Sequence, residues 1–176
     1  MASKKQGPNL SGGVFASSPF DRGYLPAFSG KAMFYVEHPP CPQPRPKARR
    51  LPMGVQIYTP NSLKVKAWKD AVRSACPVLK DVPSGPVRVS AAFVIKRPQA
   101  MCGKSYSSEY LVHLAKPDID NLLKGALDAL KGVLWNDDSQ VILGLAEKYY
   151  SPVILGGKSG RKRLPGPPGA FFLVEY

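Results

Sequence analysis

The chain has 176 residues, enough for one domain with tails, and 44% of them are hydrophobic, enough for a core. Its formal net charge of +13 favours a polyanionic partner such as nucleic acid, with an anionic membrane surface as the competing interpretation. No apolar stretch is long enough to cross a bilayer, and the N-terminus lacks a signal-peptide core, so we expect a cytoplasmic protein without a membrane partner. Three scattered cysteines indicate free thiols and offer no zinc spacing.

Residues 1–31 are rich in Gly, Ser and Pro. Residues 1–31 are predicted to form a flexible N-terminal extension, and residues 32–176 the folded domain, beginning with a strand over 32–37. The Pro-rich run 39–50 excludes helix and sheet interior and favours extended polyproline geometry. It is a solvated linker, a ligand for an SH3-like domain or a surface for DNA phosphates. Its cations are Arg45, Lys47, Arg49 and Arg50.

The middle of the chain predicts one helix and one strand. Residues 61–75 carry an apolar stripe at helical spacing, which indicates a helix that faces the core. Residues 87–96 alternate apolar side chains on one face, the pattern of a half-buried strand. The segment 98–115 is predicted to be a loop, in which Lys104 either contacts a nucleic-acid backbone or is simply solvated.

The chain is short of acid, yet four Asp residues are concentrated in the stretches 116–124 and 136–138. After Asp118 the apolar residues recur at i, i+3 and i+4, which predicts an amphipathic helix that ends near Gly132. Asp120 and Lys124 are four residues apart and are therefore neighbours on its surface. The plain alternative for Lys124 is a salt bridge to Asp120 or to the next acid along the helix, Asp128.

The second acidic stretch is predicted to be a turn that leads into a strand over 141–150. If this strand packs beside the helix start, Asp137 or Asp138 can reach Asp118 and Asp120. Carboxylates brought together repel one another unless a cation intervenes, and Mg²⁺ prefers such oxygen ligands. The alternative is structural, because Asp is an ordinary cap at a helix start and Asn-Asp-Asp-Ser is an ordinary turn.

Three more specific motifs are excluded because residues they require are missing. An EF-hand loop beginning at Asp118 would need Gly where Leu123 stands and Glu where Ala129 stands. An aspartyl-phosphate phosphatase pattern has Leu122 in place of its Thr. Gly157-Lys158-Ser159 is part of a phosphate-binding loop pattern, but Pro152 stands where its first Gly belongs, so we expect no nucleotide cofactor.

The C-terminal part is predicted to contain a basic loop over 156–169 and a last strand over 170–176. The cations of this loop are phosphate contacts or a solvated hairpin tip: Arg161, Lys162 and Arg163. The order strand, helix, strand, helix, strand, strand predicts an α+β fold, a single domain with a mixed β-sheet backed by two helices.

Three short stretches carry a family resemblance. They are Lys116-Pro-Asp-Ile-Asp-Asn-Leu-Leu-Lys124, Asp128-Ala-Leu130 and Trp135-Asn-Asp-Asp-Ser-Gln-Val141. Together they resemble the RusA-type Holliday-junction resolvases, which are small, dimeric, Mg²⁺-dependent endonucleases of phages and prophages. The similarity covers residues 33–150. It implies a RusA-like fold, a homodimer, and a Mg²⁺ cofactor for which Mn²⁺ could substitute.

The resemblance also implies roles for individual residues. Asp118, Asp120 and Asp138 correspond to the metal-binding carboxylates, Asp137 to the acid that precedes the last of them, and Lys124 to the essential lysine. The family carries a Pro-rich, Arg-containing loop after its first strand, which favours DNA contact for the cations of 39–50. The expected activity is resolution of four-way DNA junctions by paired symmetric nicks, in recombination, repair or phage DNA processing. The alternatives are a nuclease for other branched or single-stranded DNA, and a basic DNA-binding protein without activity.

Overall fold

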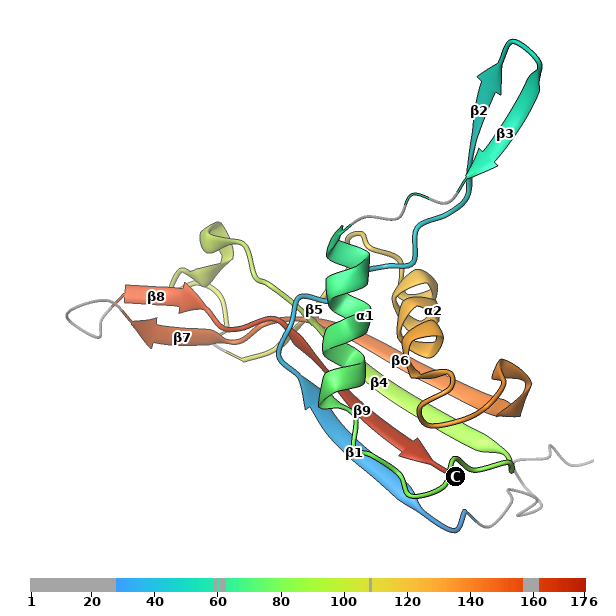
Figure 1. Ribbon diagram of the computed structural model, residues 1–176. Coiled ribbons are helices and arrows are strands. Elements are labelled where there is room, and N and C mark those ends of the chain that lie inside the picture. The colour runs from blue at the N-terminus through green and yellow to red at the C-terminus, as the bar shows by residue number, and fades with distance from the viewer. Residues whose placement is uncertain (1–27, 59, 61–62, 108, 157–161) are drawn as a thin grey trace, which may run out of the picture.

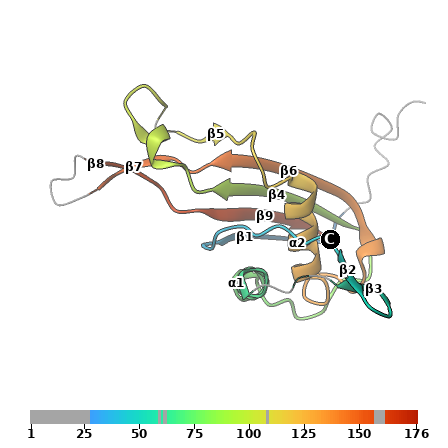
Figure 2. The same cartoon turned by 90° about the horizontal axis from the view of Figure 1, so that it is seen from above.

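A five-stranded mixed sheet forms the centre of the molecule (Figures 1 and 2). The computed structural model describes residues 28–58, 60, 63–107, 109–156 and 162–176. The strands lie in the order β1 (Lys31–Val36), β9 (Gly169–Glu175), β4 (Val87–Ile95), β6 (Val141–Tyr150) and β5 (Leu111–Val112). β4 runs parallel to β6, whereas the other neighbours are antiparallel. The predicted mixed sheet is therefore confirmed.

Two helices, α1 (Leu63–Ala75) and α2 (Ile119–Leu130), lie in front of the sheet in Figure 1. α1 buries Val65, Trp68 and Val72, the stripe expected from its sequence. α2 buries its own apolar stripe, and the helices are joined where Lys69 Nζ lies 3.3 Å from Asp128 Oδ2. The α+β class with two helices backing one sheet is confirmed. No helix among the described residues is both long enough and apolar enough to cross a membrane.

The two faces of the sheet differ in burial. On β4 the side chains of Val87, Val89 and Phe93 are fully buried against the helices, as their alternation predicted. The opposite face carries exposed apolar side chains, among them Met33 with 78% of its surface accessible. Gly30 N donates a hydrogen bond to Tyr176 O at 2.7 Å and so continues the pairing of β1 with β9. The remainder of the predicted extension, residues 1–27, lies outside the described residues.

The end of the Pro-rich run is a strand rather than polyproline, which corrects the prediction for 39–50. β2 (Lys47–Leu51) pairs antiparallel with β3 (Gly54–Tyr58), and every residue of both strands is exposed. The last proline of the run is Pro46, so each residue of β2 has an N–H to give to a ladder. Figure 1 shows this hairpin projecting away from the sheet and the helices.

Two other predicted loops contain regular structure. The segment 98–115 includes a 3-10 helix, η1 (Gln99–Cys102), and strand β5. It is fixed by Arg97, which is 1% exposed and donates to the carbonyls of Ser107 and Glu109. Within the predicted basic loop 156–169, β8 (Lys162–Pro165) pairs with β7 (Val153–Gly156). These strands were missed because each is short and pairs only with the other.

Candidate active site

The start of α2 presents two exposed carboxylates, Asp118 and Asp120. Asp118 occupies the N-cap position, but its side chain accepts no hydrogen bond from the helix backbone. Its nearest charged partner is Arg45, whose Nη2 lies 3.9 Å from Asp118 Oδ2 while both side chains are largely exposed. Asp120 lies in the first turn and is exposed. The capping alternative is therefore not supported for Asp118, although the helix dipole still favours negative charge here.

Lys124 lies one turn beyond Asp120 and is exposed. Within the described part of the chain it forms no ion pair, and Asp128 pairs with Lys69 instead. The salt-bridge alternative for Lys124 is thus not observed. Asp118, Asp120 and Lys124 are left as three exposed charged side chains in the first two turns of α2.

Two contacts hold the chain that leads into this site. Lys148 Nζ, near the end of β6, donates to Ala115 O at 2.6 Å and to Pro117 O at 2.8 Å. Gln43 N donates to Asn121 O at 2.9 Å, so the Pro-rich segment lies against α2. These contacts bound a hollow of about 450 Å³ beside the helix start. Its lining residues are Pro42, Gln43, Lys116, Pro117, Asp118 and Asn121.

Gly125 explains how closely the Pro-rich segment approaches. A Cβ at this position would lie 3.1 Å from Cys41 O and 3.3 Å from Gln43 N, which is tighter than usual for carbon. A residue without a side chain is therefore favoured in the middle of α2, despite the cost of glycine in a helix. The close approach brings Arg45 to Asp118.

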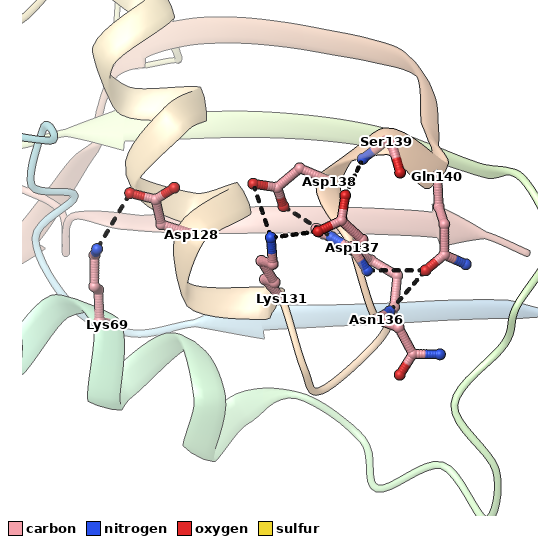
Figure 3. A network of polar contacts seen from close by, with 9 residues as sticks. Lys69, Asp128, Lys131, Asn136, Asp137, Asp138, Ser139 and Gln140 are labelled. Atoms are coloured by element: carbon pink, nitrogen blue, oxygen red, sulfur yellow. Dashed lines mark hydrogen bonds and ion pairs between the residues drawn. The ribbon is translucent and has the colours of Figure 1, made fainter.

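The second acidic stretch is a tightly bonded turn (Figure 3). Asp137 caps the short helix η2 (Asp138–Gln140), and its Oδ1 accepts from Ser139 N at 3.0 Å. Lys131 Nζ lies 2.8 Å from Asp137 Oδ2. The hydrogen bond from Lys131, aided by the one from Ser139 N, holds the pKa of Asp137 well below its ordinary value. Asp137 therefore acts as a structural cap of this turn, as the structural alternative in the sequence analysis proposed.

Asp138 is held less tightly. Trp135, which is fully buried, donates from Nε1 to Asp138 Oδ1 at 3.3 Å. Lys131 Nζ lies 3.8 Å from Asp138 Oδ2, and the carboxylate is about half exposed. Figure 3 shows Lys131 reaching both acids from the end of α2. Asp138 is thus placed beside the C-terminal end of the helix.

The two acidic clusters lie at opposite ends of α2. The helix has 12 residues, and at 1.5 Å per residue its ends are about 18 Å apart. Among the described residues there is no group of three His, Cys, Asp or Glu side chains that could hold a metal. The expectation that Asp137 or Asp138 reaches Asp118 and Asp120 is not met within one chain. The short connection places the start of β6 beside the end of α2, whereas Lys148, near the other end of β6, contacts the chain that enters the helix.

The predicted DNA-binding residues are spread over several elements. Arg45 lies at the acidic site, and three more cations, Lys47, Arg49 and Arg50, lie on β2. Lys104 is exposed after η1. Arg163 on β8 donates from Nε to Cys102 O at 2.7 Å, so it also joins β8 to η1. Lys162 is exposed beside it, whereas Arg161 lies outside the described residues.

Sequence reasoning missed the residues that hold the acids in place. Lys148 falls within the strand predicted over 141–150 and Lys131 at the end of the predicted helix, and the sequence assigned neither of them a role. Nothing in their spacing marks them, because their partners are backbone carbonyls of a distant segment and acids of a turn. The signal that could have been used is the surplus of cations around a rare acidic cluster.

The chain matches the endodeoxyribonuclease RusA family over residues 37–153. This region contains all the site and DNA-binding residues described above except Arg161, Lys162 and Arg163. The protein belongs to this family. It is also 28% identical over 123 residues to the uncharacterized protein YqaN of Bacillus subtilis (strain 168), an alignment that covers 67% of this chain and 87% of that protein. The resemblance seen in the sequence is therefore confirmed, and RusA membership indicates endodeoxyribonuclease activity.

RusA nucleases generally depend on a divalent metal, and the donors at the start of α2 fit such an ion. Asp118 and Asp120 are exposed and offer hard carboxylate oxygens two residues apart. The side chain of Asp118 accepts no capping hydrogen bond from the helix backbone. Mg²⁺ is bound in many sites by one or two carboxylates together with water and phosphate oxygens. One chain therefore presents two carboxylates that could hold a metal at one end of α2 and a further carboxylate, Asp138, at the other.

Proposed function

We propose that this RusA-family protein is a Mg²⁺-dependent endonuclease that resolves four-way DNA junctions by paired symmetric nicks, in recombination, repair or phage DNA processing. The supporting observation is the group of exposed charged side chains at the start of α2, Asp118, Asp120 and Lys124, on a chain of net charge +13. A DNA-binding protein without activity is disfavoured, because carboxylates that face phosphates repel them unless a cation intervenes.

The metal ligands would be Asp118, Asp120 and Asp138, and Mn²⁺ could replace Mg²⁺. When bound, the metal would polarise the scissile phosphate and supply a water of lowered pKa. Lys124 would donate to a phosphate oxygen and stabilise the negative charge that develops there. Asp137 is engaged by Lys131 and by Ser139 N, so we give Asp138 the larger role in the second cluster.

A homodimer offers a way to unite the two ends of α2. β5 pairs with β6 only at Tyr149 and Tyr150, so among the described residues the outer edge of β6 from 141 to 147 has no partner strand. Antiparallel pairing of this edge with a second copy would bring Asp138 of one chain towards Asp118 of the partner subunit. The same two-fold axis would present two sites to a junction of matching symmetry.

The basic residues would hold the branched DNA around these sites. Arg45 lies beside the acids, and the other proposed phosphate contacts are Lys47, Arg49, Arg50, Lys104, Arg161, Lys162 and Arg163. Phosphate contacts of this kind carry little sequence information and make binding strongly dependent on salt. They therefore support affinity for DNA in general, while the choice of substrate must come from elsewhere.

The first experiment compares Asp120→Asn with the wild type on a four-way junction with each strand labelled in turn. We expect the variant to bind the junction and to lose cleavage by a factor of at least about 100, since a metal ligand is removed. Asp128→Asn is the matched control, because Asp128 lies on the same helix but pairs with Lys69. A variant Asp120→Asn that cuts at the wild-type rate in Mg²⁺ would refute the site.

The same assay tests substrate and metal. Fork, flap and linear DNA are compared with the junction, in Mg²⁺, in Mn²⁺ and in EDTA. Paired nicks that appear only on the junction and only with a divalent ion are the expected result. Equal cleavage of forks or flaps would point to the alternative nuclease, and binding without nicks in any divalent ion would point to the DNA-binding protein.

Mixed dimers test whether the site is shared. Asp120→Asn and Asp138→Asn are co-expressed with different tags and purified through both tags. If each site combines the two ends of α2 from different chains, one site of the mixed dimer keeps every ligand and nicks one strand. If each site is built within one chain, both sites lack a ligand and the mixed dimer is as inactive as its parents.

A further inference from the structure

The β2–β3 hairpin ends in an exposed apolar tip, made of Leu51, Pro52 and Met53. Met53 is 100% exposed, and Val55 and Ile57 on β3 are 65% and 74% exposed. A two-stranded hairpin by itself is only marginally stable in water, and native proteins seldom display such a tip without a use for it. Figure 1 shows that neither the sheet nor the helices cover it.

All charged residues of the hairpin stem are basic. Residues 47–58 contain three cations, Lys47, Arg49 and Arg50, and no acid. The strand register places Arg49 opposite Gln56 and Arg50 opposite Val55, so cations project from both faces of the stem. A second copy of this hairpin would bring like charges together, whereas a DNA backbone complements them.

The base of the hairpin lies at the candidate active site. Arg45, two residues before β2, has its Nη2 3.9 Å from Asp118 Oδ2. At about 3.3 Å per residue, the five residues of β2 and the turn carry the tip about 20 Å from that point. A hairpin of this length can contact the centre of a branched DNA while the acids at its base face a strand nearby.

We propose that the hairpin tip is a wedge that inserts between bases at the branch point of the DNA, with the basic stem on the flanking phosphates. This inference rests on the proposed function and names a determinant of its substrate preference. Apolar side chains that enter DNA unstack the bases they touch, and this costs least where pairing is already interrupted. Methionine is suited to the contact, because its flexible thioether packs favourably against aromatic rings. The tip therefore favours a branch over a continuous duplex.

The test uses binding in EDTA, so that no cleavage occurs. A four-way junction carries 2-aminopurine either at the branch or in the middle of one arm, and a linear duplex of the same sequence serves as comparison. Wild-type protein should raise the fluorescence at the branch only. Met53→Ala and Met53→Gln should lose most of that rise and bind the junction about five- to tenfold more weakly, with unchanged duplex affinity.

Two control variants distinguish the effect of the apolar tip from the effects of side-chain loss elsewhere and of the basic stem. Met33→Ala removes an equally flexible side chain, 78% exposed on the open face of the sheet, and should change nothing. Arg49→Gln should weaken binding to junction and duplex alike. It should also reduce, by about one, the slope of the logarithm of the binding constant against the logarithm of the salt concentration. The proposal would be overturned if both Met53 variants kept the wild-type rise in 2-aminopurine fluorescence at the branch and the wild-type ratio of junction affinity to duplex affinity. A loss of dimer mass in sedimentation, caused by Met53→Gln, would overturn it in favour of a subunit contact.

The outcomes for the wedge and for the nuclease are independent. If the branch opens and the Met53 variants abolish the opening, but no divalent ion supports nicks, the wedge stands and the proposed activity fails. If the junction is cut as proposed and the Met53 variants bind and unstack it as the wild type does, the wedge alone fails.

Discussion

Lys131 Nζ lies 2.8 Å from Asp137 Oδ2, a contact that ties the end of α2 to the turn before β6. The same ammonium group lies 3.8 Å from Asp138 Oδ2 and so faces both acids (Figure 3). Asp137 raises the pKa of Lys131, and Lys131 lowers that of Asp137, mainly through their hydrogen bond. The pair keeps the turn closed and leaves Asp138 as the less engaged carboxylate.

This pair predicts a pH dependence of stability. An Asp in the unfolded chain titrates near about pH 4, and the pKa of Asp137 is lower in the folded protein. The stabilisation is therefore complete above about pH 4 and is lost as the pH falls through the folded pKa. Asp137→Asn should make the decline of Tm between about pH 4 and about pH 2 shallower. Asp81→Asn, an exposed acid before β4, is the control, and an equal slope in wild type and Asp137→Asn would contradict the assignment.

Lys124 is expected to act on the reaction rather than on binding. Lys124→Gln removes the cation one turn beyond Asp120, and because Lys124 has no ion-pair partner among the described residues the fold should not change. Single-turnover cleavage should fall by about 100- to 1,000-fold, as for loss of one group that stabilises developing charge. Junction affinity should change by less than about twofold. Lys80→Gln is the control, and an equal fall in affinity and in rate would make Lys124 a binding residue instead.

Gly125 is expected to control the position of Arg45. Gly125→Val adds methyl groups beyond a Cβ that would already lie 3.1 Å from Cys41 O, so it should displace the Pro-rich segment from α2. Overpacking of this kind costs about 1–3 kcal/mol of unfolding free energy. Denaturant unfolding measures it, and cleavage should fall as well. Gly85→Ala has open space around its Cβ and should leave both quantities unchanged.

Lys148 is expected to position Asp118. Lys148→Met removes the donor from the carbonyls of Ala115 and Pro117 and loosens the chain that enters α2. Stability should fall by about 0.5–1.5 kcal/mol for each of the two lost hydrogen bonds. Cleavage should need more Mg²⁺ than in the wild type and recover at high Mg²⁺, because the ligand is displaced and not removed. Lys96→Met is the control. A reduced rate that Mg²⁺ does not restore would assign Lys148 a direct role.

Local patterns in the sequence predicted the main elements of the fold. The apolar periodicity after Asp118 fixed α2 and the face it buries, and the alternation over 87–95 fixed β4. The helix in turn made Asp120 and Lys124 neighbours, because side chains four residues apart share a face. These features depend only on residues close together in the chain, so periodicity is sufficient to predict them.

Tertiary structure decided where the second acidic cluster lies. Asp138 is beside Lys131 rather than Asp118, because β6 starts at the far end of α2 and pairs in parallel with β4. The sequence also did not predict the β2–β3 hairpin after Pro46 or the hydrogen bond from Lys148 to the carbonyl of Pro117. Each depends on which distant segments meet, and that is set by pairing and packing over the whole domain. The local sequence thus indicated which acids were candidate site residues. The separation of the two acidic clusters was decided only by the fold.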